Sequence, residues 1–391
     1  MFNRNLRKIL IIFLSLLFTE FIKSQDNVNT SEKIYSIIKL FEKTYINAKF
    51  DSLLEEECYV NEIKKGQNNV PRSLAATALV YAFLSLVDEN SQLQKKASYL
   101  IEATIAKYPL WSSYKLPPER SFNLAPTTAY NLGLSSWLIW DSLERDDKIN
   151  IREMLIKESN YQLLRYPASG YTKDTKAEEN AIVPALLILS SHLFPYEENA
   201  RAWEDKALCF AYHTITVQND SPYCGIKTIT AYENFDMDNH NFGPHPLYMA
   251  APLVHFADAA LVYKAFDKKI PDEFRHNVIP LWNRLKLYLN KDFTWSTNNS
   301  WEPTGLSREI SGVTFMCVIV GINCDIESNL LSFKVKNQKD FVEKKVGIIN
   351  KQQYYDTDWF NNCIVAKRYV ISYLLHNTWI LQKTPLSVDL K

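Results

Sequence analysis

Apolar residues recur at helical spacing along nearly the whole chain. In the first such segment, Ile34, Ile38 and Phe41 lie four and three residues apart, which places them on one face of a helix. The same pattern predicts further helices at 73–87, 127–143, 149–164, 177–193, 198–214, 246–266, 271–289, 304–321 and 356–381. Strand patterns are few, and only 214–218 and 227–231 are expected to pair briefly. The chain is therefore predicted to be all-α, with few short strands.

Capping residues and prolines indicate where several of these helices begin. Thr175 and Glu178 form a capping box, in which each of two residues satisfies an unpaired backbone N–H of the other. Pro184, inside the helix that follows, is expected to bend it. Pro246 and Pro271 are each placed to begin a helix, because the first turn does not use the N–H that proline lacks.

Residues 26–391 are predicted to form a single domain, because no Pro, Gly or Ser tract marks a boundary within them. Gly is scarce, at 9 residues, which argues against barrels, glycine-rich phosphate loops and turn-dense sandwiches. The helices could form a bundle, a solenoid or a closed ring of helical hairpins. We favour the ring, an (α/α) toroid. In a ring, the long loops would gather at one mouth, where binding sites are common; these loops follow Leu110, Tyr166, Gln218 and Phe293.

The first 25 residues have the pattern of a secretory signal. Arg4, Arg7 and Lys8 precede the almost entirely apolar run Ile9–Phe18. This run is too short to span a bilayer, for which a helix needs ~20 residues. Residues 1–25 are therefore predicted to be removed on export, which leaves a periplasmic or extracellular protein with no stable membrane span. An uncleaved anchor is the alternative.

Charge and aromatic content restrict the possible partners. Lys+Arg and Asp+Glu are equal at 44 each, so the chain lacks the basic surplus typical of nucleic-acid binding. Aromatic residues reach 13%, which fits a carbohydrate cleft where sugar rings stack on Trp and Tyr. A large aromatic helical core explains the same content at least as well.

All six cysteines follow the predicted signal, and an exported chain with an even number can form disulfides. Cys209 with Cys224 and Cys317 with Cys324 are the closest pairs along the chain. Buried free thiols are an equally good interpretation. No C-x-x-C motif supports a structural zinc site.

The densest cluster of chemical groups lies in the loop Asp236–Tyr248. The proline after His245 disfavours helix there, and Tyr248 follows as the third helical residue, so its ring is expected to point back over the loop. His240, His245 and Tyr248 can then meet beside a helix N-terminus, which favours anions. Three interpretations remain: proton transfer by His and Tyr, which we favour; a divalent metal held by His240, His245 and Asp238; and a purely structural loop. No other cofactor is predicted.

Other candidates for substrate contact lie outside this loop. Asn180 lies early in an otherwise apolar helix, where an unpaired amide would be costly, so it could point into the mouth of the ring. Trp295 and Trp301 are candidate platforms for stacking sugar rings. Arg308 could hold a substrate carboxylate as a bidentate fork, although a solvated turn explains it equally well. Further candidate substrate-binding residues are Arg120, Asn239 and Tyr171.

Two stretches together resemble the toroidal polysaccharide lyases, the group that includes heparinase II/III-like, chondroitin AC-type and alginate lyases. Asn180 begins a helix as the carboxylate-neutralising Asn does in those enzymes. The segment from His240 to Tyr248 resembles their His…Tyr segment, with a Gly-Pro just before the helix that carries the Tyr. The resemblance covers roughly residues 166–289.

The resemblance implies β-elimination on an acidic polysaccharide or oligosaccharide. A base removes the C5 proton of a uronate, and the bond at C4 breaks to leave an unsaturated sugar. Asn180, aided by Arg308 or Arg120, would neutralise the C6 carboxylate. His240 or His245 would be the base, and Tyr248 would give a proton to the leaving oxygen. The sequence departs from the family in three respects. Two His compete for one role, the chain is too short for the large C-terminal β domain of many such lyases, and no Arg lies in a motif that fixes its role.

Two other functions fit the same sequence. A toroidal glycoside hydrolase needs two carboxylates ~5 or ~6.5–9.5 Å apart; candidates are Asp174, Glu178, Asp236 and Asp238. An exported glycan-binding protein without catalytic activity is the other alternative.

Overall fold

The computed structural model describes residues 30–47, 69–115, 124–170, 173–238, 243–290, 310–322, 325–332, 357–381 and 385–386. Helices account for 73% of this part of the chain, and none of it forms a β-strand, which confirms the all-α prediction. The predicted signal segment, 1–25, lies outside these residues.

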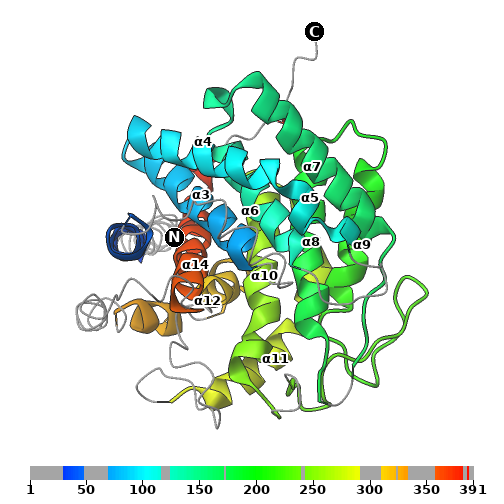
Figure 1. Cartoon of the computed structure of the whole chain (residues 1–391). Helices are drawn as coiled ribbons and strands as arrows, with labels where there is room; N and C mark the ends of the chain where they lie inside the picture. Colours follow the sequence, from blue (N-terminus) through cyan, green and yellow to red (C-terminus); the bar gives the residue numbers. More distant parts are fainter. Residues whose placement is uncertain are drawn as a thin grey trace, which may run out of the picture.

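Most helices fall where the apolar periodicity predicts them (Figure 1). The α-helices are α3 (Asn69–Val87), α4 (Ser91–Ala106), α5 (Tyr108–Trp111), α6 (Ala125–Leu138), α7 (Arg145–Leu163), α8 (Ala177–Leu193), α9 (Ala200–Tyr212), α10 (Pro246–Ala265), α11 (Val278–Leu285), α12 (Ile310–Phe315) and α14 (Thr357–His376). Residues 30–41 and 325–332 are also helical. Two short π-helices are η1 (Glu42–Ile46) and η9 (Met316–Val320). The short 3-10 helices in the described residues are η4 (Ser113–Lys115), η5 (Trp140–Ser142), η6 (Asp272–Arg275), η7 (Lys286–Tyr288) and η10 (Thr378–Ile380).

The helices divide into two kinds by burial. α6, α8 and α10 bury almost all of their residues, because their sequences are apolar on every side. α4 and α9 bury one face and expose the other. We call α3, α6, α8, α10, α12 and α14 the buried helices, and α4, α7, α9 and α11 the covering helices.

The buried helices pack in chain order. Each lies against the next, and α14 lies against α3, so the contacts return to the helix where they begin. Figure 1 shows α14 beside α3, although they come from opposite ends of the chain. Among the covering helices, α4 contacts α3 and α6, α7 contacts α6 and α8, α9 contacts α8, and α11 contacts α10. From α3 to α12 the chain therefore alternates between buried and covering helices.

A buried charged cluster joins α10 to α14. The Asp258 carboxylate accepts hydrogen bonds from Lys367 Nζ at 2.9 Å and from Arg368 Nη1 at 2.8 Å, and none of the three side chains is more than 3% exposed. Tyr130 of α6 donates its hydroxyl to the backbone carbonyl of Asp258, and its ring centroid lies 5.1 Å from Lys367 Nζ. The cluster thus connects three buried helices.

The predicted capping box is wrong, although α8 begins at Ala177 as expected. The N-cap of α8 is Lys176, which has a φ of +61° and makes no side-chain capping bond. Thr175 instead donates from its backbone N and its Oγ1 to the carbonyl of Asp238, at 3.3 and 3.2 Å. The hydroxyl therefore joins two loops rather than capping a helix. Pro184 lies inside α8, which continues to Leu193.

The single helix predicted at 271–289 is also wrong. This stretch forms η6, α11 and η7 in succession. Asn277 has a left-handed backbone, with a φ of +54°. Its Nδ2 donates to the carbonyl of Ile215 at 3.0 Å and to Asp220 Oδ2 at 2.8 Å. This tertiary contact holds the break between η6 and α11. In addition, α4 is not among the predicted helices.

The two predicted strand segments lie side by side without forming a strand. Thr216 N donates to Thr230 Oγ1 at 2.9 Å. The carbonyl of Thr216 accepts from the backbone N of Thr230 at 2.9 Å and of Ala231 at 3.0 Å. These contacts bring 214–218 and 227–231 together as predicted, in irregular backbone.

The cysteines include both bridged and free thiols. Cys317 is disulfide-bonded, whereas Cys209, Cys224 and Cys363 form no disulfide.

In α3, Val70–Val87 is long and apolar enough to cross a membrane by length and composition, and 83% of it is buried inside the structure. Core helices of that kind pass the same test.

Candidate functional site

The loop that leads into α10 is anchored at Asp236. Arg284 of α11 donates to its carboxylate from Nε at 2.7 Å and from Nη2 at 2.6 Å, as a bidentate pair. Tyr288 Oη and Asn234 Nδ2 donate to it as well, each at 2.8 Å. Burial raises the pKa of Asp236, but the bonds from Arg284 and Tyr288 outweigh it and hold the pKa below its ordinary value. Asp236 is therefore an ionised anchor with its lone pairs occupied.

Asp238 joins this loop to the one that precedes α8. Its Oδ2 accepts from the Tyr232 hydroxyl at 2.5 Å and from the backbone N of Lys173 at 3.2 Å. Its backbone carbonyl accepts both bonds from Thr175. Its Oδ1 is buried and has no hydrogen-bond partner in the described part of the chain.

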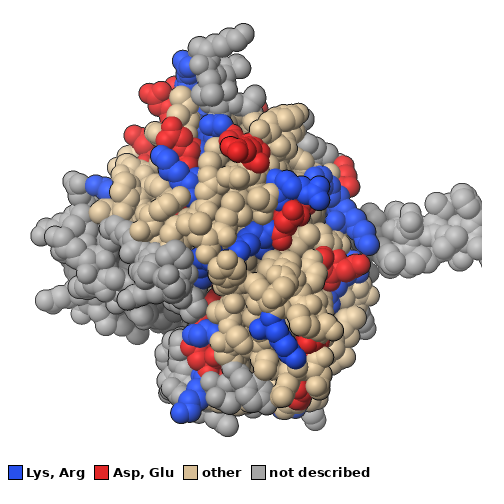
Figure 2. Space-filling model, turned by 90° about the vertical axis from the view of Figure 1, so that its right-hand side faces the viewer, with Lys and Arg blue, Asp and Glu red and all other residues tan. Residues whose placement is uncertain are grey.

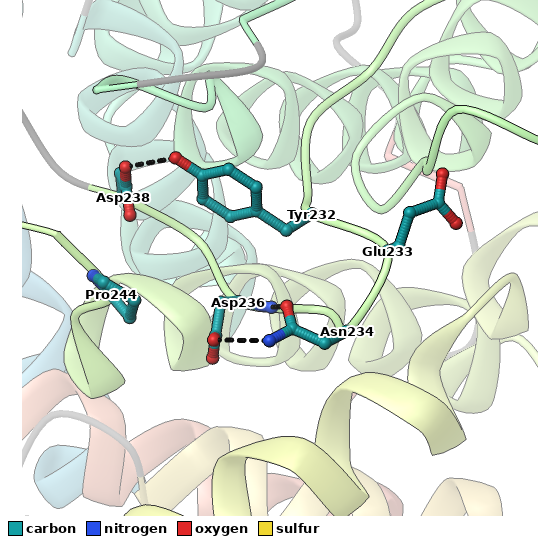
Figure 3. Close-up of a pocket in the computed structure, with 6 residues that line it drawn as sticks. All are labelled: Tyr232, Glu233, Asn234, Asp236, Asp238 and Pro244. Atoms are coloured by element: carbon teal, nitrogen blue, oxygen red, sulfur yellow. Dashed lines mark hydrogen bonds between the residues drawn. The ribbon is translucent and has the colours of Figure 1, made fainter.

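A pocket of about 450 Å³ opens along this loop. Figure 3 shows the residues that line it, with the Tyr232 ring directed at Asp238, the Asn234 amide directed at Asp236, and Glu233 turned away from both. The lining residues are Tyr232, Glu233, Asn234, Asp236, Asp238 and Pro244. The pocket is therefore lined by three carboxylates: Glu233 is turned away from the other two, Asp236 is fully bonded, and Asp238 is not.

Tyr248 links the first turns of two buried helices. Its hydroxyl, on α10, donates to Glu179 Oε2 of α8 at 2.8 Å. Lys176 Nζ donates to the other oxygen, Glu179 Oε1, at 3.0 Å, and also pairs with Asp174. Burial and the negative charge of Glu179 raise the pKa of Tyr248, so that the phenol stays protonated. The N-terminal ends of α8 and α10 therefore share one polar cluster.

His245 lies at the N-cap of α10, with extended backbone as predicted before a proline. Its backbone N donates to the carbonyl of Met237 at 3.0 Å. Burial lowers the pKa of its imidazole below the ordinary value of 6.5, so the ring is neutral near pH 7. His245 and Tyr248 thus offer a neutral imidazole and a protonated phenol within the first turn of one helix.

Asn180 is held by protein backbone, unlike the expectation that it points into an open mouth. Its Oδ1 accepts from the backbone N of Ala168 at 2.8 Å. Its Nδ2 donates to the carbonyls of Ala168 and His213, each at 2.9 Å. The side chain is 1% exposed. These bonds use both amide hydrogens and the amide oxygen, so Asn180 stabilises the segment before α8 and the end of α9.

Seven predicted site residues lie outside the described residues, and their roles stay predictions: Arg120, Tyr171, Asn239, His240, Trp295, Trp301 and Arg308. Within the described residues, no group of three or more His, Cys, Asp and Glu side chains could hold a metal ion. The metal set proposed from the sequence includes His240, so it also stays a prediction.

Glu179 and Lys176 belong to the site but are not among the residues predicted from the sequence. Their signal was present, because Glu179 is a carboxylate beside Asn180 in the first turn of an otherwise apolar helix. Such a group needs a partner when buried, and the partner, Tyr248, lies 69 residues further along the chain. The predicted association of the stretch before α8 with the loop before α10 is present, through Glu179–Tyr248 and Thr175–Asp238 rather than through Asn180.

Comparison with family models, curated proteins and solved structures finds no match to this chain. Figure 2 shows Lys and Arg interspersed with Asp and Glu over the described part of one face, with no strong bias of charge there.

Proposed function

We propose that this chain is an exported lyase on an (α/α) toroid, which cleaves a uronate-containing polysaccharide by β-elimination. The alternation of buried and covering helices supports the toroid, as does the contact of α14 with α3. A helical ring is expected to carry its site where the loops between hairpins meet. The polar cluster at the N-terminal ends of α8 and α10 is such a place.

The observation that carries the proposal is the pairing of a proton acceptor and a proton donor at the start of α10. His245 is neutral near pH 7 because burial lowers its pKa. Tyr248 is protonated, and its hydroxyl is held by Glu179 at 2.8 Å. β-Elimination needs both kinds of group, one to take a proton from carbon and one to give a proton to oxygen.

In the proposed reaction, His245 takes the C5 proton of the uronate and the C–H electrons form the C4–C5 double bond. The C4–O bond breaks, and Tyr248 gives its proton to the leaving oxygen. The proton on His245 then returns to Tyr248, directly or through a water molecule, so that the enzyme returns to its starting state. Glu179 positions the phenol, and Lys176 compensates the charge of Glu179. His240 is the alternative base.

The negative charge that develops on the uronate carboxylate needs a stabilising partner. Asn180 is excluded from this role, because its amide is fully bonded to backbone. The N-terminus of α10 contributes a positive dipole end. The cation in the proposal is Arg120 or Arg308.

The experiment that tests this function incubates the protein with a panel of uronate polymers and measures ultraviolet absorbance and new chain ends. A lyase produces an unsaturated sugar, so ultraviolet absorbance rises together with new chain ends. If no polymer gives a rise in absorbance, with or without Ca²⁺ or Zn²⁺, the lyase proposal fails. Binding of an acidic polymer without any cleavage would favour the non-catalytic glycan-binding alternative.

The second candidate, a glycoside hydrolase, is favoured by one observation. Asp238 lines the pocket, and its buried Oδ1 has no partner among the described residues. A carboxylate oxygen without a donor is available for a water molecule or a sugar hydroxyl. In this case new reducing ends would appear without ultraviolet absorbance, and Asp238→Asn would abolish them, whereas Tyr248→Phe would leave most of the activity.

A further inference from the structure

Two free thiols meet at the C-terminal end of α9. Cys209 lies in the last turn of α9 and is 5% exposed. Cys224 is exposed and lies in the tight turn Tyr223–Ile226. The Cys224 side chain lies beside that of Cys209. Cys363, which also forms no disulfide, bonds instead to Thr77 of α3.

Several contacts that do not involve the two cysteines hold the turn against the end of α9. His213 Nε2 lies 3.0 Å from the carbonyl of Tyr223. The ring of Tyr212 stacks on the ring of Tyr223, with centroids 4.5 Å apart. The Tyr223 hydroxyl donates to Glu273 at 2.8 Å. The residue directly before Cys224 is therefore fixed from three sides.

The backbone at Cys224 is unusual for its residue type. Its φ is +50°, in the left-handed region that favours glycine, and the next residue is Gly225, with a φ of +71°. A side chain at such a position is disfavoured unless its surroundings fix it. Here the surroundings include the contacts that fix Tyr223, the preceding residue.

We propose that Cys209 and Cys224 are a disulfide-forming pair, joined when the protein meets an oxidising disulfide such as oxidised glutathione or the active-site disulfide of an oxidoreductase. The exposed Cys224 loses its proton and attacks one sulfur of the oxidant, which releases one thiol and leaves a mixed disulfide. Cys209 then loses its proton and attacks the Cys224 sulfur, which releases the second thiol. The two cysteines lose two electrons and two protons, and the oxidant is reduced to two thiols.

Burial and nearby charge affect Cys209, which attacks in the second step of the exchange. Burial raises the pKa of the Cys209 thiol, as does its contact with Cys224, and the positive charge of Lys206 opposes both. Cys209 is also buried, whereas Cys224 is exposed to the oxidant, so exchange begins at Cys224. This order predicts that a transient adduct with the oxidant forms on Cys224 and not on Cys209.

The disulfide would stabilise segments that hold the candidate site, although neither cysteine is part of that site. It closes a short loop that contains His213 and Thr216. His213 accepts from Asn180, and Thr216 bonds to the segment that leads to the pocket. Closing a loop lowers the entropy of the unfolded chain and so stabilises the fold. The proposal is independent of whether the chain is a lyase, because it concerns only the end of α9 and its turn.

The experiment uses the full chain after incubation with a glutathione redox buffer. The protein is unfolded without reductant, its free thiols are blocked with one alkylating reagent, and after reduction the released thiols are labelled with a second reagent. Peptide mapping is expected to find the second label on Cys209 and Cys224. The proposal would be overturned if both cysteines carried the first label. It would also be overturned if Cys224 kept a glutathione adduct while Cys209 carried the first label. Unfolding before labelling removes any effect of burial.

A stability measurement provides an independent check. Cys224→Ser is expected to lower the melting temperature of the oxidised protein by several degrees and to leave that of the reduced protein nearly unchanged, because Cys224 is exposed. Cys363→Ser is the matched control, since its effect is expected to be the same in both redox states. Equal melting temperatures for oxidised wild type and oxidised Cys224→Ser would contradict the proposal.

Discussion

At the scale of single residues, the sequence predicts which groups are unusual better than it predicts their partners. The amide at Asn180 is expected to need partners, and Tyr248 is singled out as a chemical group; in the structure both side chains are hydrogen-bonded. The partners are Ala168 and His213 for Asn180, and Glu179 for Tyr248. Those contacts join segments 12 to 69 residues apart, and helical periodicity carries no information at that separation.

Asn180→Ala is expected to destabilise the fold. The substitution removes three hydrogen bonds and leaves buried backbone groups of Ala168 and His213 unpaired. The expected cost is about 2–4 kcal/mol in the free energy of unfolding, measured by chemical denaturation. Asn219→Ala is the control, because its amide lies on the surface and bonds only at 3.5 Å. Unchanged stability, together with a large rise in KM, would instead assign Asn180 to the substrate.

The pH dependence of the elimination reports on the base. Because burial lowers the pKa of His245, the imidazole stays in its neutral, proton-accepting form as the pH falls through 6.5. The rate is therefore expected to hold at pH 6.5 and to fall only in more acidic solution. Initial rates from about pH 4.5 to about pH 8 would show this. A rate that is already half-lost at or above pH 6.5 would argue against His245 as the base.

At the scale of elements, the sequence locates α8 and α10 closely and fails at 271–289. Apolar runs begun by a capping residue or a proline are local signals, so they can be interpreted without the fold. The interruption at Asn277 depends on Ile215 and Asp220, which lie on another part of the chain. The same limit applies to Thr175, whose hydroxyl bonds to Asp238 instead of capping α8.

The contact between α10 and α14 is expected to depend on Asp258. Burial alone would raise the pKa of this carboxyl, but Arg368 and Lys367 outweigh it and keep Asp258 ionised. Burial and the charge of Arg368 lower the pKa of Lys367 to about 7 even beside Asp258, so without the carboxylate Lys367 loses its proton. Asp258→Asn then leaves the buried Arg368 cation without its carboxylate, so a loss of about 3–5 kcal/mol in the free energy of unfolding is expected.

The matched control for that substitution is Asp272→Asn. Its carboxylate is 81% exposed and its pair with Lys269 is solvated, so a change within about 0.5 kcal/mol is expected. Both variants can be compared by urea denaturation at neutral pH. Similar stabilities for the two variants would show that the cluster does not hold α10 to α14.

At the scale of the whole molecule, composition and periodicity predict an all-helical protein, and that prediction is confirmed. We favour a closed ring from the sequence, but periodicity does not predict which helices meet, and the contact of α14 with α3 joins helices from opposite ends of the chain. The placement of Tyr248 on Glu179 is a consequence of the same packing, since α8 and α10 are neighbours among the buried helices. The candidate site is thus a product of the fold more than of any one motif.

The central claim is that the cluster at the N-terminal ends of α8 and α10 performs β-elimination. The most direct measurement is the initial rate of ultraviolet absorbance on a uronate polymer that the wild-type protein cleaves, repeated with Tyr248→Phe and with Tyr196→Phe. Tyr248→Phe removes the proposed proton donor and is expected to lower kcat by about 10²–10⁴-fold. Tyr196 is 94% exposed, so its variant is expected to match the wild type. Equal rates for all three proteins would contradict the account.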